Sequence, residues 1–114
     1  MELSETQLYV MACLSMPSGV KQVCYASCPY HHECRDNELC VYGTAIALER
    51  CGILRGHELR NRDAVRKAEK KLWQYDLIKE RKGLISNVVF FSMKGEVRDE
   101  DLMWRRHVLR NDSG

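Results

Sequence analysis

Residues 64–95 read AVRKAEKKLWQYDLIKERKGLISNVVFFSMKG, and this stretch decides the predicted fold. Its first half belongs to an amphipathic helix that we expect within residues 60–78, with Asn61 as the N-cap. Val65, Ala68 and Leu72 recur at helical spacing and predict one apolar face. The basic residues lie about 100–240° around the helix from Val65, so the basic face is nearly opposite the apolar one. They are Arg66, Lys67, Lys70 and Lys71, with Arg62 at the edge of the arc.

The second half of the stretch predicts a β-hairpin. Residues 77–81 form one expected strand, residues 87–93 form a second that is rich in Val and Phe, and Gly83 lies in the turn between them. Residues 55–82, which include the helix, hold ten Lys and Arg against five Asp and Glu, a balance of +5. In a chain of net charge +2 this local excess indicates an anionic partner, although a solvated helix face is a simpler explanation.

The N-terminus predicts another helix. Ser4 is a good N-cap, and Gln7 completes a capping box three residues later. Leu8, Met11 and Leu14 recur on roughly one face. Because proline lacks a backbone N–H, we expect the helix to stop at the MPSGV segment, residues 16–20.

Two more helices complete the expected order. One runs through residues 38–50, with Asp36, Asn37 or Thr44 as its cap. The other lies within residues 94–114, where acidic residues come early and arginines late, in agreement with the helix dipole.

Composition and length restrict the class of protein. A chain of 114 residues fits one domain. The sequence contains no apolar run long enough for a bilayer span, and its first 20 residues lack the basic start of a signal peptide. We therefore expect a cytoplasmic protein, or a nuclear one in a eukaryote, in which disulfides are disfavoured. The sequence contains no G-x-S-x-G, P-loop, H-E-x-x-H or dinucleotide fingerprint, so we do not expect an enzyme.

The stretch at residues 64–95 resembles the recognition helix and wing of winged helix-turn-helix proteins. The shared features are a helix ending in Lys-Leu-x-x-x-x-Leu-Ile, a charged wing, and a strand ending near Lys-Gly. LSETQLYVMACLSMP, residues 3–17, is similar to the first helix of the MarR-like and ArsR-like branches. The resemblance implies one winged-helix domain over residues 1–114, mainly α with a small β-hairpin. Residues 50–63 depart from the family because they are longer than its short second helix and tight turn.

The resemblance implies a DNA-binding transcriptional regulator. Its recognition helix would span roughly residues 61–75 and enter the major groove of double-stranded DNA, while the wing reaches adjacent phosphates. A homodimer on two half-sites is the expected high-affinity form. The alternative is a winged-helix adaptor that docks on a polymerase or on another transcription, phage or viral assembly. The candidate nucleic-acid-binding residues are Arg60, Arg62, Arg66, Lys67, Lys70, Lys71, Lys79, Arg81 and Lys82.

Four of the six cysteines gather in CYASCPYHHECRDNELC, residues 24–40. The spacing is Cys24-x3-Cys28-x5-Cys34-x5-Cys40, within an expected irregular insertion over residues 21–42. Four thiols in a segment with few large apolar side chains predict a metal centre, because metal bonds can replace a missing core. Unliganded thiols and disulfides remain alternatives.

The identity of the metal stays open between zinc and a [4Fe-4S] cluster. Zinc sites usually bring cysteines in close pairs, which only the first spacing approaches, although His31 or His32 could supply a nitrogen ligand. CPYHHEC, residues 28–34, resembles the Cys-Pro-x4-Cys element of several iron–sulfur proteins, including the WhiB regulators. The metal would be structural or redox-sensing. The two other cysteines, Cys13 and Cys51, are expected in or near the core.

Overall fold

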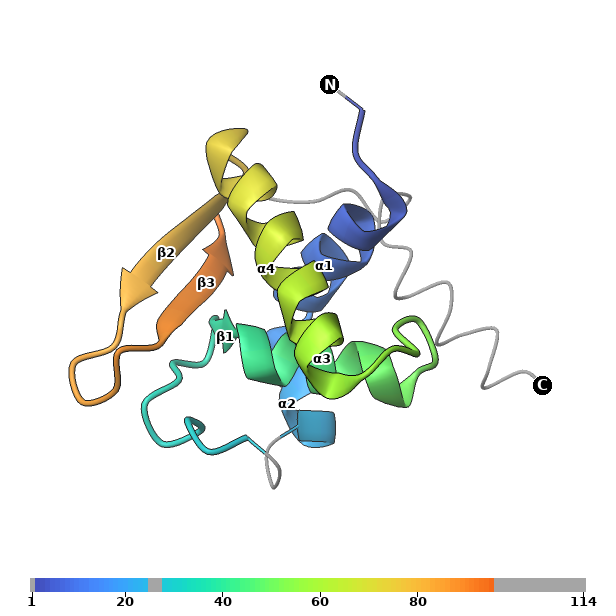
Figure 1. Ribbon diagram of the computed structural model, residues 1–114. Helices are drawn as coiled ribbons and strands as arrows, with labels where there is room; N and C mark the ends of the chain where they lie inside the picture. The colour runs from blue at the N-terminus through green and yellow to red at the C-terminus, as the bar shows by residue number, and fades with distance from the viewer. Residues whose placement is uncertain (1, 25–27, 96–114) are drawn as a thin grey trace.

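The computed structural model describes residues 2–24 and 28–95, which form four helices and a three-stranded antiparallel sheet (Figure 1). The helices are α1 (Glu5–Ser15), α2 (Pro17–Cys24), α3 (Val41–Arg50) and α4 (Glu58–Gln74). The strands are β1 (Leu39–Cys40), β2 (Ile78–Lys82) and β3 (Val89–Met93). The helix expected within residues 94–114 lies almost wholly outside the described residues.

The capping box predicted at the start of α1 is confirmed. The Gln7 N–H donates to the Ser4 hydroxyl at 3.2 Å, and the Ser4 N–H donates to the Gln7 side chain at 2.9 Å. The first helix stops where the sequence predicted, because α1 ends at Ser15, but a helix that was not predicted, α2, begins at Pro17. Proline fits this position because the first N–H of a helix has no partner within the helix.

Helix α3 follows β1 directly. Its N-cap is Cys40, whose side chain makes no capping bond, so the expected caps Asp36, Asn37 and Thr44 are wrong. Gly43 lies buried in its first turn, where an added Cβ would lie 3.2 Å from the Cys24 sulfur. The glycine therefore allows α2 to approach α3 closely.

Helix α4 begins earlier than predicted. His57 is the N-cap and accepts a hydrogen bond from the Leu59 N–H at 3.2 Å, so Asn61 is not the cap. Asn61 is buried and connects the turn before α4 to α3. Its amide donates to the Gly56 carbonyl at 2.9 Å and to the Glu49 carboxylate at 3.0 Å.

The sheet contains the predicted hairpin and one strand that was not expected. The strand order is β1-β3-β2, with Leu39 opposite Phe91 and Ile78 opposite Met93. The hairpin strands begin one or two residues later than predicted. The expected fold of helices and a hairpin alone is therefore corrected, because residues 39–40 pair with β3 and extend the sheet.

The core lies between α1, α3, α4 and the sheet. Val10 and Cys13 of α1 and Leu48 of α3 are fully buried in it, and so are Val65 and Leu72 of α4. The apolar face predicted for α4 is therefore confirmed. None of the helices in the described part of the chain has the length and apolar character needed to cross a bilayer.

Candidate functional site

Most of the predicted nucleic-acid-binding residues are exposed on α4 and β2. Lys67 forms an ion pair with Asp63 one turn earlier at 3.1 Å, and both side chains remain largely in solvent. Exposed pairs of this kind contribute only about 0.3–0.5 kcal/mol, so Lys67 can exchange its partner for a phosphate at little cost. The exposed residues are Arg60, Arg66, Lys67, Lys70 and Lys71 on α4, with Lys79 and Lys82 on β2.

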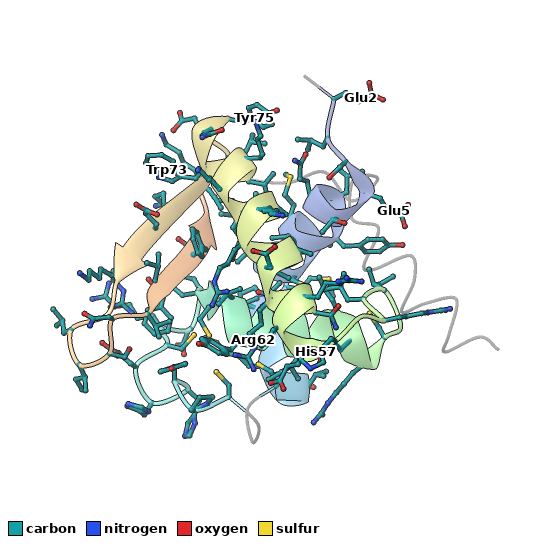
Figure 2. The ribbon with its side chains drawn as sticks, in the orientation of Figure 1. Glu2, Glu5, His57, Arg62, Trp73 and Tyr75 are labelled. Atoms are coloured by element: carbon teal, nitrogen blue, oxygen red, sulfur yellow. The ribbon has the colours of Figure 1, made fainter. Side chains whose placement is uncertain are left out.

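Arg62 is held within the protein. It forms an ion pair with Glu58, and its guanidinium lies 4.7 Å from the centre of the Tyr42 ring. Figure 2 shows Arg62 and His57 near the start of α4, and Trp73 and Tyr75 near its end. The side chain of Arg62 is only 19% exposed, so it connects α4 to α3.

Arg81 is also engaged by the protein. Its guanidinium donates to both carboxylate oxygens of Glu38, at 2.9 and 2.7 Å, and to the Glu33 carbonyl at 3.1 Å. It also lies 4.8 Å from the centre of the Phe90 ring. Burial alone would raise the pKa of the Glu38 carboxyl, but the hydrogen bonds and charge of Arg81 outweigh it and lower that pKa. Arg81 therefore fastens the cysteine segment to the hairpin.

A cavity of about 470 Å³ separates α4 from the hairpin. Arg66, Lys70 and Trp73 line it from α4, and Glu80 and Val89 line it from the strands. Glu69 also lines this cavity, although its side chain is 1% exposed and neither carboxylate oxygen has a hydrogen-bond partner. Burial raises the pKa of Glu69 well above its ordinary value. Sequence reasoning missed this residue, although Glu69 follows Val65 by four positions and therefore lies about 40° from it, on the predicted apolar face.

All four cysteines of the segment line a second cavity, of about 180 Å³. Cys24 comes from the end of α2 and Cys40 from β1, while Cys28 and Cys34 come from the loop between them. The insertion over residues 21–42 was expected to be irregular, but residues 21–24 belong to α2, residues 39–40 to β1 and residues 41–42 to α3.

The thiols are close together only in part. The Cys28 and Cys40 sulfurs lie 3.6 Å apart, whereas the Cys34 thiol donates to the Glu38 carbonyl at 3.0 Å. No disulfide joins any of the six cysteines, all of which are among the described residues. Among the residues that the structure describes, no group of three or more His, Cys, Asp or Glu has the arrangement of a metal site.

The surroundings of the four thiols shift their pKa values in opposite directions. The hydrogen bond from Cys40 lowers the pKa of Cys28 to about 6, and the same contact raises the pKa of Cys40. Burial raises the pKa of Cys24 to about 11 and also raises that of Cys34. Cys28 is thus the thiol that most readily becomes a thiolate, the form that binds metals.

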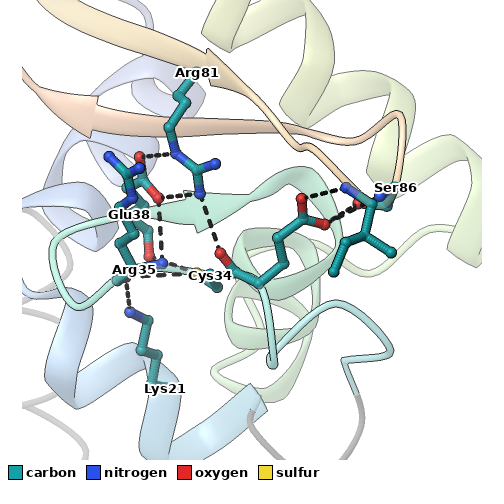
Figure 3. Close-up of polar contacts among 8 residues, drawn as sticks. Lys21, Cys34, Arg35, Glu38, Arg81 and Ser86 are labelled. Carbon is teal, nitrogen blue, oxygen red and sulfur yellow. Dashed lines mark hydrogen bonds and ion pairs between the residues drawn. The ribbon is translucent and has the colours of Figure 1, made fainter.

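Glu33, which the sequence did not single out, fastens the loop between β2 and β3 to the cysteine segment through its contacts with Ile85 and Ser86, the latter labelled in Figure 3. Its carboxylate accepts hydrogen bonds from the Ile85 N–H at 2.9 Å, the Ser86 N–H at 3.1 Å and the Ser86 hydroxyl at 2.6 Å. The hydroxyl bond and these N–H bonds lower the pKa of Glu33 to about 2. An added Cβ on Gly83 would lie 2.7 Å from a Glu33 oxygen, so only glycine fits there without movement.

The two isolated cysteines lie as predicted. Cys13 is fully buried in α1, and Cys51 is half-buried just after α3.

No family model, curated protein or solved structure matches the chain. What the chain does must therefore be inferred from its own residues.

Proposed function

We propose that this protein is a winged helix-turn-helix DNA-binding regulator with a four-cysteine metal centre. The single observation that carries the proposal is the order helix, helix, strand, helix, helix, strand, strand with a β1-β3-β2 sheet. In that arrangement α3 and α4 form the helix-turn-helix and the β2–β3 hairpin forms the wing. Helix α2 is then an extra element between the first helix and the first strand.

The distribution of charge supports DNA as the partner. Helix α4 buries Val65, Ala68 and Leu72 and exposes Arg66 and Lys70. A helix with this division can rest on the core and present cations to phosphates in the major groove. Each neutralised phosphate releases counterions, which makes the affinity depend on salt. The proposed contacts are Arg60, Arg66, Lys67, Lys70 and Lys71 from α4, with Lys79 and Lys82 from the wing, while Arg62 and Arg81 position these elements.

Zinc fits the observed sulfur geometry better than a cluster. Two thiolates on one tetrahedral zinc, each about 2.3 Å from the ion, lie about 3.8 Å apart. The Cys28 and Cys40 sulfurs lie 3.6 Å apart, close to that value. A [4Fe-4S] cluster binds each thiolate on a different iron, which requires wider spacing. Cys24 and Cys34 line the same cavity and are the proposed third and fourth ligands.

The DNA proposal is tested by the salt dependence of binding to a labelled duplex. We expect Arg66→Ala and Lys70→Ala each to weaken binding and to reduce the salt slope by about one for each phosphate that the variant no longer neutralises. Lys94→Ala is the matched control, because Lys94 forms an ion pair with Asp76 at the end of the hairpin away from its loop. Unchanged affinity and slope in both α4 variants would refute the proposal.

The metal proposal is tested by metal analysis and an absorption spectrum of protein purified without oxygen. We expect one zinc per chain and no visible absorption band. Cys28→Ser should lower both the zinc content and the unfolding midpoint, whereas Cys51→Ser, outside the cavity, should keep the zinc. Iron and sulfide together with a visible band would show that the metal centre is a cluster and not zinc. A wild-type protein without metal would contradict both the zinc and the cluster hypotheses.

The exposed aromatic residues at the end of α4 favour the second candidate, an adaptor that docks on a transcription or viral assembly. Trp73 is 49% and Tyr75 is 38% exposed. Aromatic residues are enriched in protein interfaces. Two results together would favour the adaptor. The wild type would bind no duplex, and Trp73→Ala would lose binding to a protein partner that the wild type binds.

A further inference from the structure

Two neighbouring apolar side chains project from the loop between β2 and β3. Leu84 is 92% and Ile85 is 81% exposed, the highest values among the large hydrophobic residues of the described part of the chain. Single exposed hydrophobic residues are common on protein surfaces. Two consecutive ones at the tip of a hairpin form a narrow apolar point, which we call the wing tip.

The wing tip is held in a defined position. The Glu33 carboxylate binds the backbone at Ile85 and both the backbone and the hydroxyl of Ser86. The Gly83 N–H donates to the Val88 carbonyl at 2.8 Å, which closes the base of the loop. Because these bonds order the loop before any partner arrives, insertion of the tip costs less conformational entropy than insertion of a free loop.

The charges around the wing tip suit a nucleic acid. Lys82 immediately precedes the loop, and Lys79 lies on the same strand, both exposed. Across the cavity between α4 and the hairpin lie the cations Arg66 and Lys70. Glu80 also lines that cavity, and Glu33 carries a negative charge beneath the loop, so these four cations face two carboxylates.

We propose that the wing tip inserts Leu84 and Ile85 into the minor groove of duplex DNA and kinks it. This inference rests on the proposed DNA binding and adds a mode of contact. The minor groove is only about 6 Å wide, and apolar wedges between base steps bend DNA by about 20–90°. A stable protein interface covers about 800 Å² on each partner, much more than two side chains provide. The narrow tip, with Lys82 next to it, therefore matches a groove lined by phosphates.

The wedge is tested by energy transfer between dyes at the two ends of an A·T-rich duplex of about 20 base pairs. We expect saturating wild-type protein to shorten the distance between the dyes. The double variant Leu84→Ser, Ile85→Ser should leave the duplex straight and weaken binding by about tenfold or less. Leu59→Ser is the matched control, because Leu59 is 63% exposed but lies at the start of α4, and it should bend the duplex like the wild type.

The other outcomes separate this inference from the proposed function. Saturable binding without bending would overturn the wedge and leave DNA binding intact. Absence of any binding at low salt would overturn both. Full bending by the double variant would also overturn the wedge. If sedimentation then showed a dimer for the wild type and a monomer for the double variant, a second copy of the chain would be the partner of the tip.

Discussion

Replacement of Glu69 should stabilise the protein and remove part of its pH dependence. The Glu69 side chain is 1% exposed, and both of its carboxylate oxygens lack a hydrogen-bond partner. A buried polar group without a partner costs about 1–3 kcal/mol. Glu69→Met has a similar unbranched shape and no polar atom, so we expect it to raise the free energy of unfolding at pH 7 by about that amount.

The pH dependence has a definite sign. Burial raises the pKa of Glu69 in the folded state, so the folded protein holds the proton more tightly than the unfolded chain. The stability linked to Glu69 is therefore fully present below the unfolded pKa of about 4.3, and it is lost as pH rises toward the folded pKa. The loss is at most about 1.4 kcal/mol for each pH unit. Glu69→Gln cannot titrate, so it should gain stability relative to the wild type over this range.

The assay is urea unfolding at several pH values from 4 to 8, followed by circular dichroism. The wild type, Glu69→Gln and Glu69→Met are compared with the exposed control Glu80→Gln, which should change stability by less than about 0.5 kcal/mol. A constant difference between wild type and Glu69→Gln at all pH values would refute the reasoning, because it would mean that Glu69 titrates equally in the folded and unfolded states.

Two further predictions use pairs of equivalent substitutions. Gly19 lies exposed in α2, and an added Cβ there would meet no neighbouring atom within 4 Å, so Gly19→Ala should raise the free energy of unfolding by about 0.5–1 kcal/mol. Gly43→Ala should instead lower the unfolding midpoint, because its Cβ would lie 3.2 Å from the Cys24 sulfur. An equal effect of both would contradict the close approach of α2 and α3. Arg81→Met should lower the thermal midpoint more than Arg62→Met. The partner of Arg81, Glu38, has only 6% of its side chain exposed, whereas the partner of Arg62, Glu58, has 68% exposed. Similar midpoints of the two variants in calorimetry would show that the Arg81–Glu38 pair contributes no more than a surface pair.

The sequence by itself determined the features that depend on near neighbours along the chain. The Ser4–Gln7 capping box forms within one helical turn, and Val65, Ala68 and Leu72 share a face because of the helical repeat. The hairpin follows from two strand-forming runs on either side of a glycine. Cys24, Cys28, Cys34 and Cys40, which are near one another in the sequence, line one cavity, while their predicted role as metal ligands stays a prediction.

Only the tertiary structure decided the features whose partners lie far away in the chain. Strand β1 has two residues and no pattern of its own, and it exists because β3 offers unpaired backbone groups about 50 residues later. The sequence predicted Arg81 as a phosphate contact, whereas in the structure Arg81 forms an ion pair with Glu38. Glu33 holds the hairpin loop because it accepts a hydrogen bond from Ser86. Each of these outcomes depends on the burial and pairing of polar groups, which a local sequence pattern does not contain.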